Sequence, residues 1–407
     1  MDLSSADARA ARMDAGRLGR IGEHLQRRYI DAGRIPGSLT LVLRGGELAY
    51  AHCAGRRDLE RDLPMTADTL FRIYSMTKPV TSVALMTLWE RGLLVLDDPV
   101  HRFIPEWKDL QVRRGGAWPL FETQPPRRPM TVRDLLRHTA GLTYDFMRSS
   151  NVDYAYRKLR LGIPAPGYTL EKMIGQLARL PLEFSPGERW NYSVATDVLG
   201  ALIERVSGRP FPDFLREEIF EPLGMRDTGF SPRPDQLERF ASCYVRDPQK
   251  RLGLHDDGRD SAFSGRSFFS GGGGLLSTAG DYLRFCRMLA GGGSLDGQRI
   301  IGRRTLALMT ANHLPGGGDL ASLSAAGFSE TDNDGVGFGL GFACKLDPVR
   351  NGYPASPGSF YWGGMASTLF WVDPQEDLVV LFLTQLIPSQ TFNFRGQLEA
   401  LVYAALD

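Results

Sequence analysis

The sequence predicts an α+β fold: one antiparallel sheet built from both chain ends and flanked by helices, plus an inserted, mostly helical domain. Two observations lead to this. Strand-like periodicity occurs near both ends, over residues 39–53 and again over 335–384. The stretch between them reads as helices separated by Pro- and Gly-rich loops. We therefore expect a sheet domain from residues 1–98 and 291–407, a helical domain from 99–290, and an active site in the cleft between them.

Composition narrows the class of protein. The 407 residues are 43% hydrophobic, which is ample for a large core, and 48 basic residues nearly balance 47 acidic ones. No basic stripe points to nucleic acid, and no apolar run is long enough to span a membrane. The N-terminal stretch lacks the apolar core of a secretory signal. We expect no nucleic-acid partner, no membrane and a cytoplasmic location; the oligomeric state stays open.

Cysteine and histidine usage gives no support for a metal site. The four Cys lie far apart in the sequence, and the six His form no zinc-binding pattern such as H-E-x-x-H. Disulfide or metal roles are possible for Cys53, Cys243, Cys286 and Cys344, but buried free thiols are the better reading. We expect neither a metal nor another cofactor.

The N-terminal part begins with an amphipathic pattern over residues 6–33, which predicts a helix. Two short strands follow at 39–43 and 48–53, and the Arg-Gly-Gly-Glu sequence at 44–47 predicts a hairpin between them. A helix then starts at Ser75 and is stopped by Gly92.

The central part reads as helices. Thr131 is expected to cap one, residues 194–206 form another, and 281–289 form a third. Loops at 124–129 and 163–167 separate such segments.

The C-terminal part returns to strand periodicity. Strands are predicted at 337–345, 359–372 and 378–384, with residues 373–377 connecting the last two as a hairpin. Residues 394–406 close the chain as a helix.

Ser75 and Lys78 are the strongest candidates for chemistry. On a helix, residues three apart share a face, so the hydroxyl and the amine can meet. A serine needs a base to become a nucleophile, and a lysine can be that base where burial lowers its pKa. S-x-x-K occurs once, and the chain has only six Lys against 42 Arg. The plain alternative is a helix-capping serine followed by a solvated lysine.

Tyr192 lies between a Pro-Gly turn and the helix predicted at 194–206. A tyrosine at such a junction can share a proton with Lys78, although by itself it would more often be a packing residue. His138 could pose as a general base, but we interpret it as a structural histidine near a helix end.

Trp362, Gly363 and Gly364 lie in a strand-like segment, and glycines there indicate a bulge or a close backbone approach. A substrate could lie along them. The backbone N–H groups of Met365 and Ser75 could then form an oxyanion hole. A sheet bend without a ligand is an equally good reading of the glycines.

Together, residues 75–78 (SMTK), 192–194 (YSV) and 362–364 (WGG) resemble the three motifs of the serine β-lactamase and penicillin-binding-protein superfamily. The match is closest to the family VIII carboxylesterases, which are similar to class C β-lactamases. The phrases TVRDLLRHTAGL from Thr131 and GGGGLLSTAGDY from Gly271 also resemble that family. The resemblance covers about residues 15 to 405.

The resemblance implies a β-lactamase/DD-peptidase-like fold, with Ser75 as acyl nucleophile and Lys78 and Tyr192 as the groups that activate it. The backbone of Ser75 and Met365 would hold the oxyanion, and the segment from Trp362 to Gly364 would contact a small-molecule ester.

Two departures from the class C pattern favour neutral esters. Val194 stands where those enzymes have Asn, and Trp362 stands where they have Lys. The lipase-type G-x-S-x-G motif is absent. We therefore expect a serine hydrolase of short-chain neutral carboxylic esters. The alternatives are a β-lactamase, a D-amino-acid peptidase or an acyltransferase using the same site, or a non-enzymatic acyl-binding sensor.

Overall fold

The fold is built on one eight-stranded antiparallel sheet. The computed structural model describes residues 2–162, 167–325 and 333–406. The strand order is β12-β13-β14-β15-β16-β1-β2-β3. The strands are β1 (Gly37–Arg44), β2 (Glu47–Asp58), β3 (Leu63–Pro64), β12 (Val336–Phe338), β13 (Ala343–Lys345), β14 (Phe360–Gly364), β15 (Thr368–Asp373) and β16 (Leu378–Leu383).

Both ends of the chain meet at the centre of this sheet, as predicted. β1 pairs with β2 on one side and with β16 on the other, with Leu41 opposite Leu381. The β1–β2 hairpin turns at Gly45 and Gly46, whose φ angles of 60° and 81° glycine adopts without a steric penalty. β15 and β16 are buried along their whole length, because helices cover the sheet.

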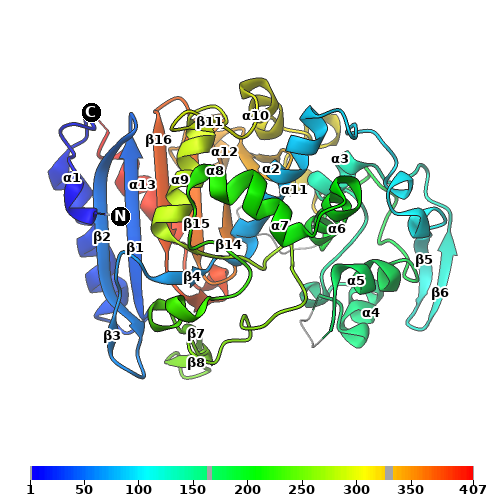
Figure 1. The fold of residues 1–407 in the computed structure, drawn as a ribbon, viewed down its shortest axis with the longest axis horizontal. Coiled ribbons are helices and arrows are strands. Elements are labelled where there is room, and N and C mark those ends of the chain that lie inside the picture. The colour runs from blue at the N-terminus through cyan, green and yellow to red at the C-terminus, as the bar shows by residue number, and fades with distance from the viewer. Residues whose placement is uncertain (1, 163–166, 326–332, 407) are drawn as a thin grey trace.

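Helices pack on the sheet from two sides (Figure 1). α1 (Ala15–Leu25) contacts α13 (Phe394–Tyr403) on one side, while α9 (Ala279–Ala290) packs against β15 and β16. The predicted helix over 6–33 is wrong at its N-terminal end. The α-helix begins at Ala15, because Arg12 has a φ of 52° and the Asp14 side chain caps the helix by accepting from the Arg17 N–H. After Leu25 it continues as a π-helix over Gln26–Ile30.

The central part is largely helical and surrounds α2 (Thr77–Glu90) and α6 (Ala195–Ser207), which pack against each other. Thr131 caps α3 through a capping box with Asp134, as expected for the cap, although α3 already ends at Leu136. The other α-helices of the central part are α3 (Val132–Leu136), α4 (Asn151–Leu159), α5 (Leu170–Leu177), α7 (Phe211–Leu215) and α8 (Glu221–Leu223). Three short α-helices follow α9, namely α10 (Arg303–Thr310), α11 (Leu320–Leu323) and α12 (Pro348–Asn351).

The sequence analysis missed several strand pairs in and around this central part. β5 (Val112–Ala117) and β6 (Leu120–Gln124) form the hairpin at the far end from α1 in Figure 1. β7 (Cys243–Arg246) pairs with β8 (Leu252–Asp256) and with β17 (Leu386–Ile387), and β10 (Ser294–Leu295) pairs with β11 (Gln298–Arg299). β4 (Leu70–Arg72) pairs with β9 (Leu276–Thr278), which ties the segment before Ser75 to the chain before α9.

Two predicted C-terminal strands are each a pair of strands. The segment 337–345 contains β12 and β13, and 359–372 contains β14 and β15, joined by a turn at 365–367. The connection at 373–377 is a hairpin turn, as predicted. The loop predicted at 163–167 lies, apart from Gly167, outside the described residues. The division into two domains with a cleft between them stays a prediction.

In the parts of the chain that the structure describes, no helix is both long enough and apolar enough to cross a membrane.

Candidate active site

Ser75 lies in a 3-10 turn, Tyr74–Met76, that leads directly into α2. The preceding residue, Tyr74, has a φ of 41°, an uncommon conformation for a bulky side chain. Such backbone outliers persist only where their surroundings hold them, and they cluster at functional sites. Ser75 itself is 8% exposed, while Met76 and Thr77 beside it are fully buried. Ser75 therefore keeps a little access to solvent, beside the partly exposed Tyr74.

Lys78 reaches Ser75 from the first turn of α2. Its Nζ lies 3.3 Å from Ser75 Oγ and donates a hydrogen bond of 2.6 Å to the Gly272 carbonyl oxygen. The Lys78 side chain is almost fully buried. Its Nζ is held between Ser75 Oγ and the Gly272 carbonyl oxygen. The structure thus brings together the two side chains that the spacing in the sequence paired.

The aromatic rings of Tyr192 and Tyr144 lie next to the Lys78 amine. The Lys78 Nζ lies 4.5 Å from the centre of the Tyr192 ring and 5.3 Å from that of Tyr144. The two rings are tilted against each other with 5.3 Å between their centroids. Cations are attracted to aromatic faces, so this pair of rings gives Lys78 a defined position. The structure therefore also places the third predicted residue next to the first two.

Asp197, two residues into α6, is a buried acid that the sequence analysis missed. It accepts hydrogen bonds from the Gly272 N–H at 3.0 Å and from the Ser270 hydroxyl. Burial raises the pKa of this carboxyl, and the positive charge of Lys78 acts in the opposite direction. Asp197 therefore holds the segment from Ser270 to Gly272 in place, and the Gly272 carbonyl oxygen accepts the hydrogen bond from Lys78.

A glycine at position 272 leaves room for this arrangement. A Cβ atom there would lie 2.7 Å from Asp197 Oδ2 and 2.9 Å from the Tyr144 hydroxyl. Tyr144, Asp197 and Gly272 come from three separate segments, so no spacing in the sequence relates them. The available signals were the Gly271–Gly274 run, used only as part of the resemblance to the family, and the position of Asp197 five residues after Tyr192.

The segment Trp362–Gly364 lies at the end of β14. Gly364 passes so close to the Ser75 turn that a Cβ atom there would lie 2.4 Å from the Ile73 carbonyl oxygen. The close backbone approach indicated by the glycines is therefore present. Met365 follows in the turn to β15, which the Ser367 N–H closes by donating to the Gly364 carbonyl at 2.9 Å. This places the predicted second oxyanion donor on a turn and not within a strand.

Trp362 is only 1% exposed. Its ring packs against Tyr192, 5.5 Å between centroids, and edge-on against Phe338 at 5.3 Å. The indole N–H has no hydrogen-bond partner among the described residues. In this structure the tryptophan supports Tyr192 from behind, and its predicted contact with substrate stays a prediction.

His138 fits the interpretation as a structural residue. It is buried, and its ring packs against Trp190, Tyr192 and Phe338. Burial and the nearby charge of Lys78 hold the pKa of His138 well below 6.5, so the imidazole is neutral. Its Nδ1 lies 3.3 Å from the Ser193 hydroxyl.

The described residues contain no group of three or more His, Cys, Asp or Glu side chains placed to hold a metal ion. The four cysteines are free, as expected; three are buried, and Cys53 is half-buried.

The fold and this site together define the class of protein to which the chain belongs. A serine at the start of a buried helix, a lysine one turn on and an antiparallel strand beside them are the arrangement of the serine β-lactamases and penicillin-binding proteins. A profile described as β-lactamase matches residues 23–404. The chain belongs to this family, within its esterase branch.

Three proteins illustrate what the chain is similar to. Protein Rv1367c of Mycobacterium tuberculosis is 40% identical over 366 residues, 89% of each chain. Esterase EstB of Burkholderia gladioli is 33% identical over 402 residues, 94% of each chain. The solved structure of EstCE1, described as a hydrolase with promiscuous acyltransferase activity, is similar with a TM-score of 0.79 and 30% identity, covering 96% of this chain and 98% of its own. The chain is a serine hydrolase of the β-lactamase family.

Proposed function

We propose that the protein hydrolyses short-chain neutral carboxylic esters through an acyl-enzyme on Ser75, with Lys78 and Tyr192 as the activating groups. The observation that carries this is the 3.3 Å separation of Lys78 Nζ and Ser75 Oγ at the start of α2. A hydroxyl this close to a buried amine can lose its proton as it attacks, which is what an acyl nucleophile requires.

In the acylation step, Ser75 Oγ forms a bond to the ester carbonyl carbon, and its proton passes to the Lys78–Tyr192 pair. The carbonyl oxygen becomes an oxyanion between the backbone N–H groups of Ser75 and Met365. The bond to the alcohol oxygen then breaks, and the alcohol leaves with the proton that the pair returns. The close packing of Gly364 on Ile73 supports this role, because it holds the Met365 turn next to the Ser75 turn.

In the second step a water molecule gives a proton to the same pair and attacks the acyl carbon, which releases the acid and restores Ser75. An alcohol in place of water would give a new ester by the same proton transfers. This acyltransferase activity is the second candidate, and the description of EstCE1 as a hydrolase with acyltransferase activity favours it.

The preference for neutral esters rests on Trp362. A lysine at this position would supply a cation for a substrate carboxylate, and hydrogen bonds to charged groups contribute roughly 1.5–3 kcal/mol. Tryptophan carries no charge, and with Trp362 only 1% exposed this position supplies no cation to a substrate carboxylate. We expect carboxylated β-lactams to be poor substrates, although the acylating groups are shared.

The test compares kcat/KM for p-nitrophenyl butyrate with that for a chromogenic cephalosporin, using Ser75→Ala as the blank. A higher value for the ester supports the proposal. An equal or higher value for the cephalosporin overturns the esterase assignment. Adding a primary alcohol and measuring the new ester against the free acid then gives the balance between hydrolysis and acyl transfer.

A further inference from the structure

A cavity lies away from Ser75, between the segment that follows α2 and the loop before α3. Its volume is about 220 Å³. Its lining includes the basic side chains of Lys108, Arg127 and Arg128 and the apolar side chains of Leu110, Met130 and Leu182. No residue of the catalytic group lines it, so it needs an explanation of its own.

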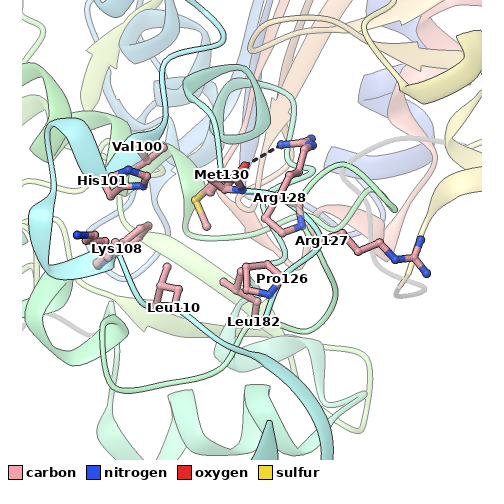
Figure 2. A pocket seen from close by; sticks show the side chains of 12 residues that line it. Val100, His101, Lys108, Leu110, Pro126, Arg127, Arg128, Met130 and Leu182 are labelled. Atoms are coloured by element: carbon pink, nitrogen blue, oxygen red, sulfur yellow. Dashed lines mark hydrogen bonds between the residues drawn. The ribbon is translucent and has the colours of Figure 1, made fainter. Parts of the chain in front are cut away.

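The floor of this cavity is apolar and firmly built. Trp107 and Leu182 are buried, and the Trp107 indole N–H donates to the Ile174 carbonyl at 3.1 Å. Met130 is held from the backbone, because its carbonyl accepts from the Val100 N–H at 2.8 Å. Figure 2 shows Leu110, Pro126 and Leu182 along one wall, with the Met130 side chain facing the interior. Such a floor favours an apolar ligand body.

The charged side chains that line the cavity are all basic. Of its twelve described lining residues, none is acidic. Arg127 and Arg128 pair with carboxylates that do not line the cavity, Glu188 at 3.0 Å and Asp134 at 2.6 Å. In the described part of the chain, no carboxylate lies within 4.0 Å of Lys108 Nζ. Lys108 and His101 lie on the same side of the cavity in Figure 2. The cavity thus joins an apolar floor to a cation without an acidic partner.

We propose that this cavity, which we call the Lys108 pocket, binds a small apolar monocarboxylate. The carboxylate lies at Lys108 and His101, and the apolar body lies against Met130 and Leu182. An apolar cavity of about 150 Å³ is large enough for benzene, so the Lys108 pocket has room for a ring of that size plus a carboxylate. It is smaller than the roughly 300–1,000 Å³ of sites for drug-sized ligands. The proposal does not depend on the function proposed for Ser75.

The active site could also bind a carboxylate, so the experiment must tell the two places apart. The chain has 12 Met, of which Met130 lines the Lys108 pocket and Met365 lies beside the Ser75 turn. Labelling the methionine methyl groups with carbon-13 gives one NMR signal for each, and Met130→Leu and Met365→Leu assign these two. Sodium benzoate is the probe.

We expect benzoate to shift the Met130 signal in a saturable titration and to leave Met365 unchanged. Benzyl alcohol, which lacks the charge, should bind Met130 at least about threefold more weakly. Acetate, which lacks the ring, should bind at least about tenfold more weakly, because most of the apolar contact is lost. Equal binding of benzoate and benzyl alcohol would overturn the carboxylate assignment.

The matched variants are Lys108→Glu and Lys158→Glu, both at exposed lysines on the surface. Lys108→Glu should weaken the Met130 titration by about threefold or more, since it replaces attraction with repulsion. Lys158→Glu, which changes the net charge equally, should leave it unchanged. An unshifted Met130 signal at the solubility limit of benzoate, a shift at Met365 alone, or equal effects of the two variants would each overturn the proposal.

Discussion

Replacing Gly364 by alanine tests whether the contact between β14 and the Ser75 turn sets the geometry of the site. The new Cβ would lie 2.4 Å from both the Ile73 carbonyl oxygen and Thr368 Oγ1, whereas ordinary contacts begin at 3.4 Å. The strand and the turn must therefore separate by about 1 Å. Forcing an extra methyl group into a packed interior typically costs about 1–3 kcal/mol, and a misplacement of about 1 Å can cost about 10²-fold in rate.

The assay for Gly364→Ala measures kcat/KM for p-nitrophenyl butyrate and the free energy of unfolding in urea. We expect a loss of about 10²-fold in kcat/KM, together with about 1–3 kcal/mol of stability. Gly253→Ala is the control, because it is also a strand glycine and the nearest atom to its Cβ is the Val245 carbonyl oxygen at 3.8 Å. Activity within twofold of the wild type in Gly364→Ala would refute the reasoning.

A second variant separates the two contacts. Thr368→Ala removes the side-chain contact but leaves the Ile73 backbone in place. The double variant Gly364→Ala/Thr368→Ala should recover part of the stability lost in Gly364→Ala but little of the lost activity. The reason is that the contact with the Ile73 carbonyl oxygen, which remains, is the one that joins β14 to the Ser75 turn. Full recovery of kcat/KM would show that the Ile73 contact is unimportant.

Four further outcomes follow from the site. Lys78→Arg should lose nearly as much ester hydrolysis as Lys78→Ala, since a guanidinium stays protonated; a working Lys78→Arg would leave the lysine as a fixed charge only. Tyr192→Phe should lower kcat by about 10²–10⁴-fold, and a loss below about tenfold would remove it from the proton transfer. Asp197→Ala should cost about 1–3 kcal/mol in urea unfolding, because it leaves the buried Gly272 N–H without an acceptor, whereas Asp197→Asn should retain most of the stability. The neutral, buried His138 makes unfolding easier at low pH, because the unfolded chain binds a proton that the native state does not. Between about pH 7.5 and 5.5 the wild type should therefore lose about 1.4 kcal/mol that His138→Gln keeps, while the exposed His255→Gln behaves as the wild type.

The sequence predicted what depends on neighbours along the chain. Ser75 and Lys78 meet because three residues make one turn, and Thr131 caps α3 because a threonine and an acid three residues apart form a capping box. The Gly45–Gly46 hairpin follows from the positive φ angles of its turn. Each of these features needs only a few adjacent residues, so local rules are enough to find it.

The features that the sequence analysis missed are set by contacts between distant segments. Asp197, Tyr144 and Gly272 meet at Lys78 only once α6, the loop after α3 and the loop before β9 have packed. The turn at Met365 lacks an Asn-Gly or Asp-Gly pair, so β14 and β15 read as one strand until their pairing is seen. The start of α1 is a different case, because Asp14 was a readable cap signal within the predicted helix.

The most direct test of the central claim is an intact-mass measurement after rapid mixing of the protein with p-nitrophenyl butyrate and quenching in acid. We predict a transient species heavier by one butyryl group, located by peptide mapping on the segment that contains Ser75, which disappears as turnover completes. Ser75→Ala should show no adduct and no ester hydrolysis. Hydrolysis without any adduct on Ser75, or more than a few per cent of activity in Ser75→Ala, would contradict an acyl-enzyme on this serine.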